Sequence, residues 1–295
     1  MTKHLVLLLA VVMTIASADA QEKAMSARDA RLYKLARTNI SAFAHEVSKD
    51  ATSDVDRAHA IVEWLTRNFD WKATDYKNRT VQEVIERRGG NCNDLANVAL
   101  AAMKELNIRL RRVHEVQIRT ISDERGERAH AMVKEKGNAY SIFGRHHNDH
   151  IWLEVYDPQT KEWSPADPWS GLVGLHEWMT ARVGFGTRAG PSPDAADMIV
   201  PFAIFAADSD GNFTINRTRH YVVDEFDRLY DGKLHDLPEW KQWVALVERL
   251  SDKVEGAFAG RIDLHEYEPD IDSVAATYEQ LRSDYAKANP GIKSE

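Results

Sequence analysis

The sequence contains little that would suit a disulfide-bonded or nucleic-acid-binding protein. Its 295 residues include one cysteine, Cys92, so no disulfide can form within one chain. Positive charge is not in excess either, and the formal net charge of −8 argues against general nucleic-acid binding, which needs a basic face. We found no internal repeat and no low-complexity tract. With 43% hydrophobic and 28% charged residues, the composition is that of an ordinary globular protein.

Long hydrophobic runs are also absent beyond the first twenty residues. Residues 5–15 form an apolar run that follows Lys3, and residues 16–20 read ASADA, which fits a cleavage site between small residues. A helix that crosses a bilayer needs about 20 apolar residues, so this run is too short to be a membrane span. We predict a secretory signal peptide over residues 1–20 and an exported protein, soluble in the periplasm or outside the cell.

Cys92 stands where a helix is expected to begin. Residues 88–96 read RGGNCNDLA, and an apolar stripe with helical spacing follows as far as Leu106. Unpaired backbone N–H groups at a helix N-terminus favour a thiolate over a thiol. An unpaired thiol in an oxidising compartment is readily replaced unless it is used. Cys92 is therefore a candidate nucleophile, and the alternative is a buried cysteine that acts as a small hydrophobic residue.

The periodicity predicts helices before strands. Helices are expected at 53–69, 80–88, 92–106, 239–254 and 272–287, and strands at 108–118, 130–133, 151–156, 162–166, 198–205 and 213–223. Helices followed by an antiparallel sheet indicate an α+β domain. A stretch rich in proline and glycine at residues 190–194 suggests a boundary, which divides the mature chain into a catalytic domain at 21–190 and a mostly helical C-terminal accessory region at 191–295.

A predicted β-hairpin supplies partners for the thiol. His150 precedes its first strand and Asp167 ends its second. If the turn centres on Pro158 and Gln159, then His150 and Asp167 are directly opposite each other, and their side chains share a face. The carboxylate would then orient the imidazole toward Cys92.

These residues lie in three blocks that resemble the transglutaminase-like superfamily. The blocks are RGGNCNDLA at 88–96, HIWLEVYD at 150–157 and WSPADP at 163–168, and the resemblance covers residues 54–169. It implies a papain-like fold, with N-terminal helices packed on an antiparallel sheet and a C-terminal α/β extension. It also implies that Cys92 is the nucleophile, His150 the general base and acid, and Asp167 the orienting carboxylate. No cofactor and no metal are required by this chemistry.

Several residues offer alternatives. His130 also begins a predicted strand and is the rival base, since the family often has a histidine and alanine at this place. His146 and His147 could bind a metal with His150, but their spacing matches no ligand motif, and residues 208–212 lack the final glutamate of a calcium loop. Trp71 is a candidate second donor to an oxyanion. The tryptophans that could line a groove are Trp163, Trp169 and Trp178.

We therefore expect an exported thiol-dependent enzyme that transfers acyl groups from amide or peptide bonds of a protein or peptide substrate. The sequence leaves open whether water or an amine completes the reaction. It also leaves open a second class of function, a catalytically silent binding module that keeps the fold. Retention of all three residue types favours the enzyme.

Overall fold

The computed structural model describes residues 25–72, 78–118, 147–185 and 200–290. The signal peptide expected at 1–20, the strand expected at 130–133 and the boundary expected at 190–194 lie outside these ranges.

The part of the chain that the structure describes begins with five helices, each of which starts at a polar cap. They are α1 (Ala27–Thr38), α2 (Ile40–Val47), α3 (Asp54–Asn68), α4 (Val81–Arg87) and α5 (Cys92–Glu105). The side chains of Ser53, Thr80 and Asn91 each accept a hydrogen bond from the backbone three residues later, and an acidic residue completes a capping box in each case. After α5, Asn107 has the left-handed conformation that ends a helix, with φ of 57°. The predicted starts of α3, α4 and α5 are confirmed.

Six antiparallel strands form one sheet in the order β6-β5-β4-β3-β7-β8. The strands are β3 (Leu110–Ile118), β4 (His147–Asp157), β5 (Glu162–Asp167), β6 (Leu172–Val173), β7 (Val200–Ala207) and β8 (Phe213–Asn216). The α+β class and the antiparallel sheet are confirmed. Because β7 pairs with β3, a segment from beyond residue 190 lies inside the sheet.

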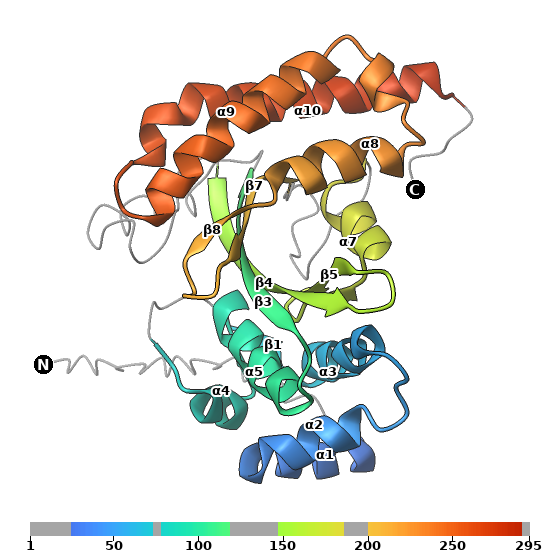
Figure 1. Ribbon diagram of the computed structural model, residues 1–295, viewed down its shortest axis with the longest axis vertical. Helices are drawn as coiled ribbons and strands as arrows, with labels where there is room; N and C mark the ends of the chain where they lie inside the picture. Colours follow the sequence, from blue (N-terminus) through green and yellow to red (C-terminus); the bar gives the residue numbers. More distant parts are fainter. Residues whose placement is uncertain (1–24, 73–77, 119–146, 186–199, 291–295) are drawn as a thin grey trace, which may run out of the picture.

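Helices cover both faces of the sheet, which lies between an N-terminal and a C-terminal layer (Figure 1). Along β4, Leu153 and Val155 pack with the core of α1 to α5, whereas Trp152 packs with the opposite core. The opposite core is built from α7 (Leu175–Arg182), α8 (Phe226–Leu229), α9 (Trp240–Phe258) and α10 (Glu268–Ala288). Because successive side chains of a strand point to opposite faces of the sheet, β4 contributes residues to both hydrophobic cores.

The strand expected at 213–223 is wrong in its second half. The strand β8 ends at Asn216, whose side chain accepts a hydrogen bond from the Thr218 backbone at 2.9 Å, and a π-helix follows at His220–Glu225. Tyr221, Val222 and Val223 are all buried. A run that is apolar on every side has no period that distinguishes a strand from a buried helix.

Across the described ranges, no helix is both long enough and apolar enough to span a bilayer.

Candidate active site

Cys92 is the first residue of α5, and two reciprocal hydrogen bonds close the cap before it. The Asn91 side chain accepts a hydrogen bond from the Asp94 N–H at 2.9 Å, and Asp94 Oδ2 accepts one from the Asn91 N–H at 3.3 Å. This capping box leaves the N–H groups of Cys92 and Asn93 without an intrahelical acceptor, as at any helix start. The cysteine thus stands beside two backbone donors and the positive end of a helix dipole.

Two glycines let the chain reach this position. The two-residue strands β1 (Asp70–Trp71) and β2 (Gly89–Gly90) pair in parallel, and a Cβ at Gly89 would lie 2.2 Å from the Asp70 carbonyl oxygen. A Cβ at Gly90 would lie 2.3 Å from the Asp94 Cβ. The pairing sets Trp71 beside Gly90, with 41% of the tryptophan exposed. Its role as an oxyanion donor stays a prediction.

His150 on β4 is held by Asp167 at the end of β5. The imidazole Nε2 lies 2.8 Å from Asp167 Oδ2, and both side chains are buried. Asp167 Oδ1 accepts a hydrogen bond from the Trp169 N–H at 3.0 Å, which fixes the carboxylate. Because Nε2 is engaged by Asp167, Nδ1 is the ring nitrogen left for Cys92, whose charge and hydrogen-bonding capacity also raise the pKa of His150.

The register of the hairpin differs from the predicted one, although the predicted face is right. Glu154 pairs with Pro165, so paired residue numbers sum to 319 rather than the expected 317. The turn has four residues, 158–161, and is closed by Lys161 with φ of 62°, whose N–H donates to the Asp157 carbonyl at 2.8 Å. His150 and Asp167 are therefore not directly opposite. A slip of two residues keeps side chains on the same face, so the contact forms diagonally.

The charge of Asp167 controls the protonation of His150. Burial lowers the pKa of His150, but the Asp167 carboxylate and the hydrogen bonds with Asp167 and Cys92 outweigh burial and raise it from 6.5 to about 10. For Asp167, burial raises the pKa, but the charge of His150 and its hydrogen bond, with a contribution from Arg182, lower it from 3.8 to about 2. The pair is an imidazolium and a carboxylate across the neutral pH range.

A guanidinium also lies close to the sulfur. Arg112 on β3 donates a hydrogen bond from Nη2 to Asn93 Oδ1, which ties it to the residue that follows Cys92. Burial lowers the pKa of Arg112, and the charge of Cys92 acts in the opposite direction. Negative charge on the sulfur is thus faced by His150, Arg112 and the start of α5.

The three candidate groove tryptophans have different surroundings. Trp169 packs edge-on against the His150 ring, with centroids 5.2 Å apart. Trp178 is buried and packs on Trp152 at 4.8 Å, so it belongs to the core. Trp163 packs beneath Arg111, whose guanidinium carbon is 4.1 Å from the ring centroid. Only Trp169 touches the candidate site.

Sequence reasoning missed a buried ionic group beside His150. Glu115 on β3 lies directly opposite His150 in the register of the β3–β4 pair. Arg182 at the end of α7 donates hydrogen bonds to Glu115 Oε1 and to Gln117 Oε1. All three side chains are buried. The available signal was local: Glu115 and Gln117 alternate with the apolar residues Val116 and Ile118 at the end of the strand, and such polar residues are buried only when they are paired.

The remaining candidates lie elsewhere. His130 and His146 are outside the described ranges, as is the side chain of His147. Asp208 caps a turn, with Oδ1 accepting from the N–H groups of Asp210 and Asn212, each at 2.9 Å. Within the described part of the chain, no cluster of three or more histidine, cysteine, aspartate or glutamate side chains is arranged to bind a metal.

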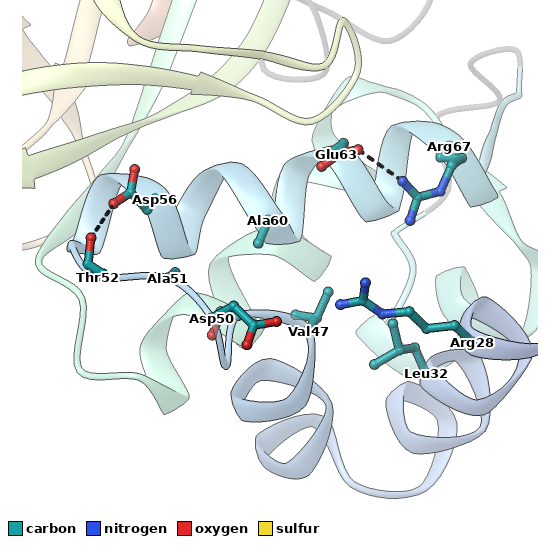
Figure 2. Close-up of a pocket in the computed structure, with 11 residues that line it drawn as sticks. Arg28, Leu32, Val47, Asp50, Ala51, Thr52, Asp56, Ala60, Glu63 and Arg67 are labelled. Atoms are coloured by element: carbon teal, nitrogen blue, oxygen red, sulfur yellow. Dashed lines mark hydrogen bonds and ion pairs between the residues drawn. The ribbon is translucent and has the colours of Figure 1, made fainter.

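A surface hollow between α1, α3 and the α2–α3 turn is separate from these residues (Figure 2). Its lining residues carry both signs of charge, positive on Arg28 and Arg67 and negative on Asp50, Asp56 and Glu63. Arg67 is already paired with Glu63 at 3.0 Å and with Asp29 at 2.9 Å. Neither the thiol nor the imidazole lines the hollow, so it is not the candidate active site.

Comparison with known proteins gives one family match. The model of the transglutaminase-like superfamily matches residues 41–168, which include Cys92, His150 and Asp167. No curated protein matches the sequence significantly.

Eight solved chains match this one, and two of them show how low the similarity is. One is a "Putative Cysteine Protease from Cytophaga hutchinsonii", 13% identical, with 62% of this chain and 54% of that chain covered and a TM-score of 0.30. The other is Rad4–Rad23 bound to a 6-4 photoproduct UV lesion, 13% identical, with 90% and 55% covered and a TM-score of 0.35. The matches thus span about half the length of either solved chain.

Proposed function

Residues 41–168 belong to the transglutaminase-like superfamily, and from this premise we propose that the protein is an exported thiol-dependent enzyme that transfers acyl groups from amide or peptide bonds. Cys92 is the nucleophile, His150 the acid and base, and Asp167 the group that orients the imidazole. The observation that carries the proposal is the placement of His150, buried between the Asp167 carboxylate and the sulfur at the start of α5.

In the proposed resting state, the Cys92 thiolate is paired with the His150 imidazolium. With Nε2 held by Asp167, Nδ1 is the ring nitrogen whose proton is available to the sulfur. The thiolate attacks an amide carbonyl carbon, and the carbonyl π electrons move to oxygen. When the tetrahedral intermediate collapses, the C–N bond breaks and His150 gives its Nδ1 proton to the leaving amine, which leaves a thioester on Cys92. Water or a second amine then attacks the thioester, loses a proton to His150 and releases the thiolate.

The oxyanion of both tetrahedral intermediates needs fixed donors. The N–H groups of Cys92 and Asn93 at the start of α5 are suitably placed, because the capping box satisfies the N–H groups around them and leaves these two. The charge of Arg112, tied to Asn93, adds to the positive potential at this point.

Export is the second part of the proposal, and it rests on the signal-like segment at residues 1–20. An exported enzyme of this chemistry would act on cell-wall peptides or secreted proteins. Expression of the full chain followed by N-terminal sequencing of the exported product tests this part, and an uncleaved protein retained in the cytoplasm would refute it.

Alkylation of Cys92 tests the proposed pair directly. The rate of reaction with iodoacetamide, followed from pH 5 to 9, is expected to stay high well below about pH 8.5, at which an ordinary thiol is half protonated. His150→Ala should abolish this reactivity at low pH, and His130→Ala should leave it unchanged. The reverse result would move the base to His130, and an ordinary thiol profile in the unaltered protein would favour a silent binding module.

Activity is tested with a glutamine-containing protein and a fluorescent amine. Released ammonia, incorporated amine and cleaved peptide bonds are measured together in the same incubation. Cys92→Ala is the matched control, and it should abolish every product that the unaltered protein forms.

A further inference from the structure

A buried ionic group lies beside His150, on the neighbouring strand of the sheet. Arg182 donates through Nη2 to Glu115 Oε1 and to Gln117 Oε1, the latter at 3.1 Å, and the second oxygen of Glu115 accepts from the Trp152 indole N–H at 2.8 Å. The side chains of Arg182 and Glu115 are completely buried. These residues come from α7, β3 and β4, so the group joins three elements.

This group shares its sheet face with His150 and Asp167. Glu115 is the direct cross-strand partner of His150, which brings their Cβ atoms within about 4.5–5.5 Å. The positive charge of Arg182 acts on Asp167. Trp169 contacts both His150 and Arg182, because the centre of its ring lies 5.2 Å from the His150 ring and 6.0 Å from the Arg182 guanidinium carbon.

Stability alone does not explain Arg182. Its Nε and Nη1 atoms are buried, and no described residue accepts a hydrogen bond from either. A buried guanidinium with unused donors costs free energy, and a buried ion pair is often replaceable by apolar side chains without loss of stability. Unsatisfied buried charges of this kind gather at functional sites.

The positive groups around His150 match the negative groups in number only if Arg182 is present. The negative groups are the Cys92 sulfur from α5, Glu115 from β3 and Asp167 from β5, and the positive groups are His150 itself, Arg182 from α7 and Arg112 from β3, which faces the sulfur. Without Arg182, the imidazolium and Arg112 would face two buried carboxylates and a thiolate. The imidazolium would then hold its proton too firmly to pass it to a leaving amine.

We propose that Arg182 is a positioning residue of the His150–Asp167 pair, and that with Glu115 it sets the pH range over which His150 gives up its proton. This inference deepens the proposed function and rests on the role of His150 stated there. Arg182 acts on the reaction through His150 and does not touch the substrate.

Titration of His150 by NMR tests the proposal in the full chain, labelled at histidine Cε1 and assigned from the signal lost in His150→Gln. Arg182→Met removes the positive charge and should raise the midpoint by on the order of one pH unit, the effect of a unit charge several ångströms away in a protein interior. At the midpoint of the unaltered protein, this variant should be about nine-tenths protonated. Glu115→Gln should lower the midpoint by a similar amount.

Two further variants separate charge from structure. Arg182→Lys keeps the positive charge, so its His150 midpoint should equal that of the unaltered protein. The double variant Arg182→Met with Glu115→Gln removes one charge of each sign, so its midpoint should also equal that of the unaltered protein. The double variant also remains informative if Arg182→Met alone does not fold. Opposite shifts in the single variants with cancellation in the double would support the proposal. Shifts of the same sign, no shift, or no cancellation would overturn it.

The titration reports on the imidazole and requires no turnover, so its outcome is distinct from that of the proposed function. If His150 is still required for alkylation at low pH but the midpoints do not respond, the inference about Arg182 fails alone. If alkylation does not depend on His150, the proposed function fails, whatever the titration shows.

Discussion

Asp167→Asn is the most informative single substitution, because it removes a charge and keeps the shape of the side chain. The carboxylate is the main cause that raises the pKa of His150 to about 10 against the opposing effect of burial. Without it, burial is opposed only by the interactions with Cys92, and the pKa of His150 should fall well below about 10. The gap from about 10 to 6.5 corresponds to roughly 5 kcal/mol of preference for the imidazolium, which also stabilises the thiolate.

The rate of iodoacetamide alkylation measures this loss. A thiol without an imidazolium partner ionises near pH 8.5, so only about 0.3% of it is thiolate at pH 6. Because a more basic thiolate is also more nucleophilic, the net loss of rate in Asp167→Asn at pH 6 should be on the order of 100-fold. The difference should nearly vanish at pH 9, where an unassisted thiol is largely ionised.

Glu154→Gln is the matched control. Glu154 is another fully buried carboxylate on the same sheet, held by Arg111 at 2.6 Å and by Tyr221 at 2.6 Å. Its loss should lower stability without changing the pH profile of alkylation. If Asp167→Asn reacts at pH 6 as fast as the unaltered protein, or if Glu154→Gln reproduces its profile, the reasoning is wrong.

Three further outcomes are expected from urea unfolding. The pKa of His150 is raised on folding, so the contribution of His150 to stability is full below pH 6.5 and is lost as the pH rises toward 10. The loss of stability in His150→Gln should therefore be larger at pH 6 than at pH 9.5 by a few kcal/mol. Equal losses at the two pH values would contradict this. Gly90→Ala should lower the free energy of unfolding by about 1–3 kcal/mol and slow alkylation, because the new Cβ would lie 2.3 Å from the Asp94 Cβ and displace the cap of α5. Stability like that of the unaltered protein would show that the cap tolerates the methyl group. Tyr221→Phe should cost about 1.5–3 kcal/mol through its lost hydrogen bond to Glu154 and leave alkylation unchanged, and a changed alkylation profile would couple this distant group to the thiol.

Local signals in the sequence were sufficient for the helices near the site. Ser53, Thr80 and Asn91 each cap a helix through the residue three positions later, and such short-range hydrogen bonds can be inferred from spacing alone. The placement of Cys92 at the first residue of a helix follows from the same kind of signal. The superfamily resemblance was likewise carried by short blocks around the candidate residues.

Contacts between residues that are far apart in the sequence could not be predicted from such local signals. The predicted hairpin register was wrong by two residues, because Lys161 adopts a left-handed conformation and extends the turn to four residues. His150 and Asp167 still met because alternation along a strand survives an even shift. The pairing of Arg182 with Glu115 joins residues 67 positions apart, and no local pattern indicates such a contact.

The position of β7 has a consequence for anyone who cuts this chain into pieces. The strand β3 is hydrogen-bonded on one side to β4 and on the other to β7, which is supplied from beyond residue 190. In a recombinant fragment of residues 21–190, β3 would become an edge strand with a row of unpaired backbone N–H and C=O groups. Such an exposed edge promotes aggregation by strand pairing between molecules. Truncation at the apparent linker would thus yield an insoluble product even though every proposed catalytic residue is retained.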